Sequence, residues 1–143
     1  MIPAPAHESA RGIVRLEIPA RAEWVAVARL AVAAVASRLP FSVDDIEDIK
    51  LAVAEACTNA IQHGPSLGTI DIVCEAGTAE LVLTVRDRGH GPPLGAVEEE
   101  RIGDAGRTEE LGVFLIRALM DNVEYTSDVR DGTQLVMVKR VTE

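Results

Sequence analysis

Residues 46–63 read IEDIKLAVAEACTNAIQH, and this stretch decides the fold of the chain. Its apolar residues recur every three or four positions, as they do along one face of an α-helix. Ser42 and Asp45 precede it in a pattern close to a capping box, which predicts that the helix begins just after Ser42. The dipeptide Gly64-Pro65 follows in the order that ends a helix. We therefore expect a long amphipathic helix that ends near His63. Its buried side is predicted to comprise Ile46, Ile49, Val53, Ala56, Ala60 and Ile61.

Three polar residues of this helix stand four positions apart. Glu55, Asn59 and His63 therefore form a ridge along one helix face, with about 6 Å between neighbouring positions. A carboxylate, an amide oxygen and an imidazole in a row could act as a general base, an oxygen ligand for Mg²⁺ and a phosphate contact. The same spacing is also typical of a polar helix edge that faces solvent. Spacing alone does not decide between the two interpretations.

Strands and further helices are predicted on both sides of the long helix. Residues 13–18 (IVRLEI) alternate apolar and polar side chains, which is typical of a half-buried strand. Residues 23–39 have apolar positions at helical spacing and stop at Pro40. The elements predicted downstream are strands at 68–74 and 80–86 around a turn at Gly77, a short helix at 111–120, and strands at 122–127 and 134–140 around a turn at Asp131-Gly132.

Most of these strands are joined as hairpins, which indicates an α+β fold. We expect a two-layer sandwich in which one mixed, mostly antiparallel sheet carries helices on one face. Residues 92–110 contain 3 glycines, 2 prolines and 6 acids, and this stretch is expected to be a functional lid or a disordered segment. Residues 1–12 are expected to be a flexible tail, and residues 13–143 a single domain.

Three short motifs lie where predicted strands and helices meet. Asp87-Arg88-Gly89-His90-Gly91 follows a strand, so Asp87 could accept a hydrogen bond from an exocyclic amine while Gly89 and Gly91 let the backbone approach a ligand. Gly112 opens the short helix, whose first amides could hold phosphate. Thr133, at the start of the last strand, could reach a base bound near Asp87. Each motif alone is equally typical of an ordinary turn or helix start.

The composition excludes several classes of function. Acidic residues number 23 against 14 lysines and arginines, a formal net charge of -9. Because phosphate contacts dominate nucleic-acid affinity, this charge argues against direct nucleic-acid binding and favours a cationic protein surface as partner. The longest apolar run, Leu30–Ala36, is too short for a membrane span, which needs about 20 residues. Cys57 and Cys74 fit no metal spacing and are expected to be reduced core residues of a cytoplasmic protein.

Taken together, the motifs resemble those of the bacterial anti-sigma-factor serine kinases, and the RsbW-like type most closely. Residues 46–63 are similar to the N-box of that family, and the run from Asp87 to Gly91 is similar to its first glycine box. Residues 111–121 (LGVFLIRALMD) resemble the second glycine box, and Gly132-Thr133, followed by Val136 and Lys139, resembles the last box. The resemblance covers about residues 13–141. It implies the Bergerat-type ATP-binding fold of the superfamily that includes histidine kinases, gyrase, Hsp90 and MutL.

The resemblance also implies a role for each matched residue. Glu55 would be the base that takes the serine proton, and Asn59 would bind the Mg²⁺ that bridges the phosphates of ATP. Asp87 would bond the adenine amino group, with Thr133 assisting through water. The implied cofactor-binding set is Asn59, His63, Asp87, Gly89, Gly91, Gly112 and Thr133.

The implied activity is transfer of the ATP γ-phosphate to a serine of a STAS-type anti-anti-sigma factor, combined with sequestration of an RNA polymerase sigma factor. The resemblance further implies a homodimer formed through the first strand and helix. Two alternatives stay open, namely a sigma-factor or STAS-binding module with little or no catalysis, and a serine kinase of the stressosome switch type. Family members carry a glycine two positions before Gly112, where this chain has Glu110. A carboxylate beside the expected phosphate cradle predicts weaker binding of the γ-phosphate.

Overall fold

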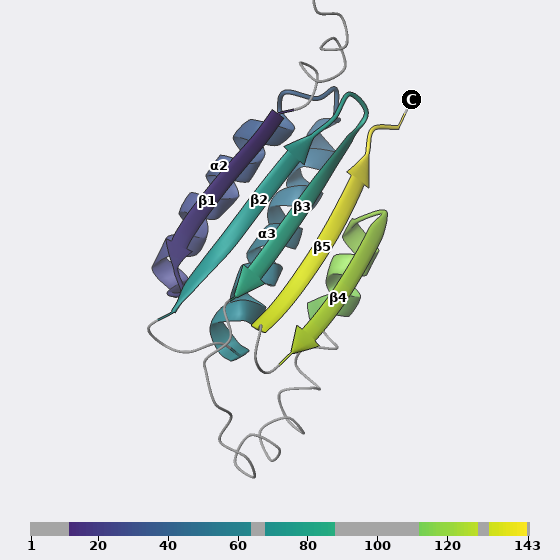
Figure 1. Cartoon of the computed structure of the whole chain (residues 1–143). Helices are drawn as coiled ribbons and strands as arrows, with labels where there is room; N and C mark the ends of the chain where they lie inside the picture. The colour runs from purple at the N-terminus through teal and green to yellow at the C-terminus, as the bar shows by residue number, and fades with distance from the viewer. Residues whose placement is uncertain (1–11, 64–67, 88–111, 129–131, 143) are drawn as a thin grey trace, which may run out of the picture.

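The computed structural model of the chain describes residues 12–63, 68–87, 112–128 and 132–142 (Figure 1). Five strands form one open sheet in the order β1-β2-β3-β5-β4, and each neighbouring pair is antiparallel. The helices cover one face of this sheet (Figure 1). The predicted α+β architecture is confirmed, and the pairing expected to be mostly antiparallel is antiparallel throughout the described strands. The strands are β1 (Gly12–Pro19), β2 (Thr69–Ala76), β3 (Glu80–Asp87), β4 (Asn122–Asp128) and β5 (Gly132–Arg140).

The long predicted helix is α3 (Val43–His63), which lies behind the middle of the sheet in Figure 1. It begins where the sequence predicts, because the Ser42 hydroxyl oxygen accepts a hydrogen bond from the Asp45 backbone N–H at 3.0 Å. This bond satisfies one of the amides that a helix start leaves without a partner. Of the predicted buried side, Ile49, Val53, Ala56 and Ala60 are buried, and Ile46 and Ile61 are partly buried.

The first helix is shorter than predicted. The sequence predicts a helix over 23–39, whereas the structure has a 3₁₀ turn, η1 (Ala22–Trp24), followed by α2 (Val25–Ala36). Beyond α2 the backbone N–H of Arg38 bonds to a carbonyl three residues back, at 3.0 Å. This tighter bonding turns the chain toward Pro40, which has no N–H with which to continue a helix.

The antiparallel pairing of β2 with β3 and of β4 with β5 is confirmed, and residues 129–131 of the second predicted turn lie outside the described residues. The Gly77 N–H bonds to the carbonyl oxygen of Glu80 at 2.9 Å and closes the turn between β2 and β3. Gly132 has a φ of 90°, which favours glycine, at the start of β5. Residues 112–119 are helical, where the sequence predicts a helix over 111–120. The proposed tail apart from Gly12, the helix-ending Gly64-Pro65 and the expected lid at 92–110 lie outside the described residues.

The core fills the space between the helices and the covered face of the sheet, and its side chains are almost all aliphatic. Side chains of a strand alternate between its two faces. In β3 this alternation puts Leu81, Leu83 and Val85 in the core, and Asp87 continues the same row. Asp87 is only 3% exposed. The strand therefore places the carboxylate of Asp87 at the end of a row of buried apolar side chains.

Both cysteines are buried free thiols of this core. Burial disfavours the thiolate, and it raises the pKa of Cys57 to about 12 and that of Cys74 to about 11. Both side chains therefore stay protonated near neutral pH and serve as packing residues, as predicted. None of the described helices combines the length and the apolar character that a membrane crossing requires.

Candidate functional site

A hydrogen bond joins two of the predicted site residues, Asp87 and Thr133. The backbone N–H of Thr133 donates to Oδ1 of Asp87 at 3.0 Å. Asp87 is the last residue of β3 and Thr133 the second residue of β5, the strand that pairs with it. A buried carboxylate fixed by a backbone amide is an oriented acceptor for an N–H group of a ligand. The structure therefore brings these two residues together, as the sequence analysis predicts.

The carboxamide of Asn59 lies against the start of the helix at residues 112–119. Asn59 is 9% exposed, and its Nδ2 atom is buried without a hydrogen-bond partner within the described part of the chain. A Cβ added to Gly112 would lie 2.5 Å from Nδ2 and 2.8 Å from Oδ1 of Asn59. Real Cβ atoms essentially never lie this close to other heavy atoms, so any side chain at position 112 would require the Asn59 amide or the helix to shift. The structure thus places a helix N-terminus directly on a buried carboxamide.

The ridge on α3 is partly described. Glu55 precedes Asn59 by one helical turn and is half-buried. Because residues four apart share a helix face, the Glu55 carboxylate and the Asn59 carboxamide border the same region. His63 is the last residue of α3, and its side chain lies outside the described part of the structure. Gly89, Gly91 and Glu110, which stands where family members carry a glycine, also lie outside the described residues.

A small cavity between α3 and the sheet lies next to two of the predicted site residues. Its volume is about 20 Å³, enough for one water molecule. Asn59 and Thr133 line it together with Tyr125 of β4, whose hydroxyl oxygen is buried. The sequence analysis did not single out Tyr125. The alternation in β4 could have found it, because Tyr125 is opposite the buried Leu135 and shares its face.

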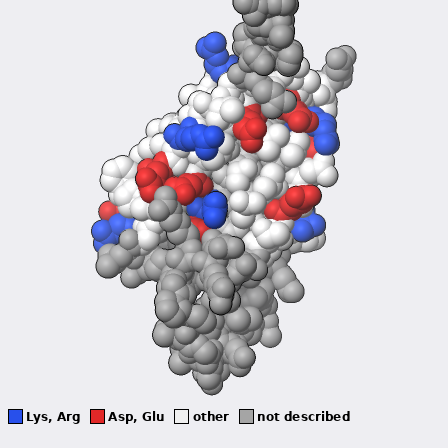
Figure 2. Space-filling view, in the orientation of Figure 1, with Lys and Arg blue, Asp and Glu red and all other residues white. Residues whose placement is uncertain are grey.

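A second hollow lies on the opposite, open face of the sheet and is separate from this site. Its volume is about 600 Å³, and charges of both signs line it, among them Arg15, Glu17, Asp71 and Arg86. Figure 2 shows this face, where acidic and basic side chains are interspersed over a largely uncharged surface. The sheet itself separates the hollow from Asn59 and Asp87, so we do not assign the hollow to the candidate site.

The groups around Asn59 suit a nucleotide with a hard metal ion. A helix N-terminus binds phosphate, and Mg²⁺ prefers carboxylate and amide oxygens. Among the described residues no three His, Cys, Asp or Glu side chains form a metal cluster. Mg²⁺ that accompanies a nucleotide is held by few protein ligands, together with the phosphates of that nucleotide. The buried Asn59 amide and the Gly112 backbone that contacts it therefore fit such a ligand.

Most of the chain matches a known protein family. Residues 18–139 match the family model described as the histidine kinase-like ATPase domain. The matched segment extends from the end of β1 to the end of β5, so it includes every candidate site residue.

Curated relatives resemble the chain over most of its length. The serine-protein kinase RsbW of Bacillus cereus strain ATCC 10987 is 36% identical over 138 residues, which cover 90% of this chain and 84% of the relative. The proteins of the same name from Bacillus thuringiensis strain Al Hakam and Bacillus cereus strain B4264 match with the same identity and coverage.

Proposed function

Because the chain belongs to the histidine kinase-like ATPase domain family, and within it to the group of the RsbW serine-protein kinases, we propose that it is a protein-serine kinase that also acts as an anti-sigma factor. Its substrate would be a serine of a STAS-type anti-anti-sigma factor, and its second partner an RNA polymerase sigma factor. ATP would supply the phosphoryl group, and Mg²⁺ would accompany it. Residues 13–143 would form the single catalytic domain, acting in the cytoplasm.

One observation carries this proposal, namely the contact between Gly112 and the buried amide of Asn59. Phosphoryl transfer depends mainly on positioning and on cancelling negative charge. A helix N-terminus supplies partial positive charge, and an amide oxygen supplies a neutral metal ligand. An acidic chain with a net charge of -9 needs such local groups to hold an anionic nucleotide.

The proposed division of labour follows from burial and position. Asn59 would hold Mg²⁺, which would offset the negative charge of the phosphates. Glu55, half-buried one turn away on α3, would accept the proton of the substrate serine. Asp87 would receive the exocyclic amine of adenine on its buried carboxylate, which the Thr133 amide orients.

Nucleotide binding is the first test of this proposal. Mg·ADP at 100 times its dissociation constant is expected to stabilise the folded chain by about 2.7 kcal/mol. Thermal unfolding with and without Mg·ADP measures this effect as a rise in melting temperature. Mg·GDP is the control, because guanine has no amino group at the position where Asp87 would meet that of adenine. An absent shift with Mg·ADP contradicts the proposed function, and an equal shift with Mg·GDP contradicts the role of Asp87.

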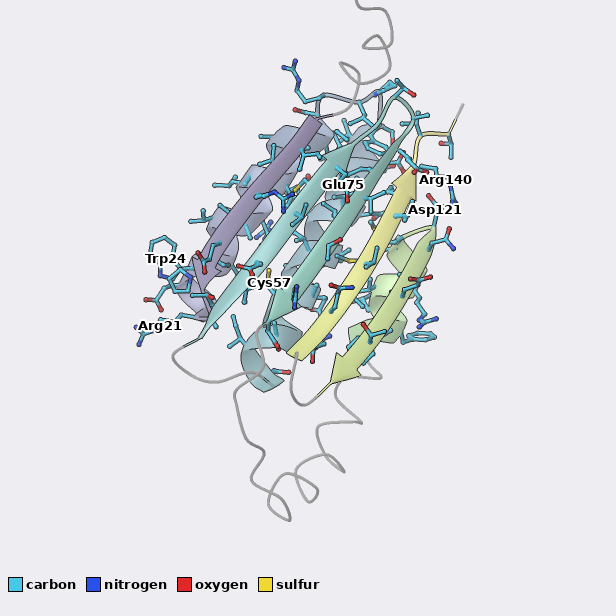
Figure 3. All side chains as sticks on the ribbon, viewed as in Figure 1. Arg21, Trp24, Cys57, Glu75, Asp121 and Arg140 are labelled. Atoms are coloured by element: carbon cyan, nitrogen blue, oxygen red, sulfur yellow. The ribbon has the colours of Figure 1, made fainter. Side chains whose placement is uncertain are left out.

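We also propose that the chain forms a homodimer through β1 and α2. β1 is an edge strand of the sheet, and apolar side chains are exposed on both elements. Figure 3 shows Trp24 at this edge, beside β1. Exposed apolar side chains gathered at one edge of a sheet are typical of a protein interface. The exposed residues are Ile13, Val14, Trp24, Val27 and Leu30.

Leu30→Arg is expected to convert the dimer to a monomer, because it places a charge on a side chain that is 69% exposed in the single chain and would be buried between two chains. Analytical ultracentrifugation measures the change in mass. Val43→Arg on α3 is the matched control, since Val43 is 76% exposed but belongs to another surface. A wild-type chain that sediments as a monomer contradicts the proposed dimer, and a Leu30→Arg dimer contradicts this interface.

The decisive experiment for the activity is incubation with Mg·ATP and a STAS-type protein of the same cell. Mass spectrometry then locates the phosphoserine. A partner that binds the chain but stays unphosphorylated would indicate the non-catalytic binding module instead.

A further inference from the structure

The side chain of Lys139 contacts two other elements, α3 and the last residue of the helix at 112–119. Lys139 belongs to β5, and its side chain is only 12% exposed. Its Nζ atom donates a hydrogen bond to the carbonyl oxygen of Leu119 at 2.6 Å. The same atom lies 3.9 Å from Oδ1 of Asp45 and 3.7 Å from Oδ2 of Asp48, both in the first turns of α3.

Leu119 is the last residue of the helix at 112–119, so Lys139 binds one of the carbonyls that a helix end leaves without a partner. A cation in this position also offsets the negative end of the helix dipole. Asp45 and Asp48, near the start of α3, balance the charge of the buried ammonium group. Burial of an ammonium group is tolerated where it is paired in this way.

A second set of bonds fastens the same helix end. The backbone N–H of Asp121 bonds to the carbonyl oxygen of Val138 at 2.8 Å, and Oδ2 of Asp121 accepts the backbone N–H of Arg140 at 2.6 Å. Figure 3 shows Asp121 and Arg140 side by side where β4 begins and β5 ends. The chain is thus attached to β5 on both sides of Lys139.

These contacts lie at the C-terminal end of the helix at 112–119, whose N-terminal residue, Gly112, lies against Asn59. Eight helical residues span about 12 Å, and a helix of this length does not bend appreciably. Only some of its side chains hold it to the core, chiefly Ile116, which is fully buried, while Phe114 is 72% exposed. The position of Gly112 against Asn59 therefore depends on how the far end is held.

We propose that Lys139 is a positioning residue for the nucleotide site: by fixing the end of the 112–119 helix to β5 and to α3, it sets the distance between Gly112 and Asn59. This inference rests on the proposed function, because it assigns the start of that helix to the phosphates. Through its ammonium group, Lys139 links β5, which carries Thr133, to α3 and to the helix that begins at Gly112. Lys139 itself touches no nucleotide and takes no part in the transfer.

Lys139→Met tests the proposal, because it keeps much of the side-chain volume and removes the charge and the donor. Calorimetry with Mg²⁺ and a non-hydrolysable ATP analogue is expected to show an affinity about tenfold lower, because a small misplacement of a binding group has a large effect. ADP, which lacks the phosphate nearest the helix start, is expected to lose less than about threefold in affinity. A lysine with a merely structural role would not change the ratio of the two affinities. Lys50→Met is the matched control, because this substitution removes the same charge from a lysine whose ion pair is with Glu47 of its own helix.

Hydrogen exchange provides a readout that does not need nucleotide. The amides of residues 116–120 are expected to exchange about tenfold faster in Lys139→Met than in wild type, while those of α3 keep their protection. Unchanged exchange together with an unchanged affinity ratio overturns the inference. A wild-type chain that binds no nucleotide contradicts the proposed function instead, and the exchange experiment still decides whether Lys139 fastens the helix.

Asp121→Ala is the second variant, because Asp121 is exposed and its loss is expected to leave the fold intact. It removes one bond to Arg140 and is expected to lower the analogue affinity in the same selective way, by about threefold. If Lys139→Met does not fold, Asp121→Ala decides: selective loss supports the inference, and wild-type affinities with wild-type exchange overturn it.

Discussion

Replacing Glu55 by alanine is expected to lower the rate of serine phosphorylation by about 10²- to 10⁴-fold, while the affinity for Mg·ATP stays within a few-fold of wild type. The physical reason is that a general base acts on the substrate hydroxyl and not on the nucleotide. Glu55 is half-buried beside Asn59, so its carboxylate can approach a serine brought to the phosphates without being needed to bind them. Rapid-quench measurement of phosphoserine on the STAS-type partner gives the rate, and calorimetry gives the affinity.

Asn59→Ala is expected to behave differently, because it removes the proposed metal ligand one turn away on the same helix. Both the rate and the Mg²⁺-dependent part of nucleotide affinity are expected to fall. Glu47→Ala is the control for both variants, since Glu47 is also on α3 but its side chain is 60% exposed. Full serine phosphorylation by Glu55→Ala would mean that another residue is the base. Equal loss of ATP affinity in the two variants would contradict the division between base and metal ligand.

The long helix illustrates what the sequence can predict. Local patterns determine α3: the Ser42 cap, the apolar period and the position of Glu55 and Asn59 all depend on residues within a few turns. The hairpins are predictable for the same reason, because Gly77 and Gly132 have local conformational requirements. The end of a helix is predicted less accurately than its existence. The apolar pattern continues to Leu39, but α2 ends at Ala36 and the next residues form tighter turns before Pro40.

Contacts between distant segments could not be predicted from such patterns. The bond between Asp87 and Thr133 joins residues 46 positions apart, and only the pairing of β3 with β5 makes it possible. The family resemblance predicts that Asp87 and Thr133 share one site, whereas the local sequence patterns predict only that each residue lies at the end of a strand. The contacts of Lys139 with α3 likewise depend on the sheet order and have no local sequence signal, whereas the alternation in β4 indicates that Tyr125 faces the core side of the sheet.

Gly112→Ala is expected to lower the affinity for Mg·ATP by about 100-fold or more, although it adds a single methyl group. The new Cβ would lie 2.5 Å from Nδ2 and 3.0 Å from Cγ of Asn59, so either the amide or the helix must move. Both are proposed to hold the nucleotide, and a shift of either disturbs the geometry. Calorimetry measures the affinity, with Gly12→Ala as the control because no atom lies within 4 Å of a Cβ added there. Unchanged affinity in Gly112→Ala would show that the nucleotide does not depend on this contact.

The stability of the Gly112 variants separates the contact from the helix itself. Overpacking by one methyl group costs about 1–3 kcal/mol. In the wild-type background Gly112→Ala is therefore expected to be destabilising. In an Asn59→Ala background the obstructing amide is gone, so the same substitution is expected to lose most of this cost. Urea unfolding of the wild type, the two single variants and the double variant completes this double-mutant cycle. Its interaction energy measures the steric conflict between a side chain at position 112 and Asn59. An interaction energy near zero would mean that residues 112 and 59 are not in contact in solution, and the proposed nucleotide site would lose its principal support.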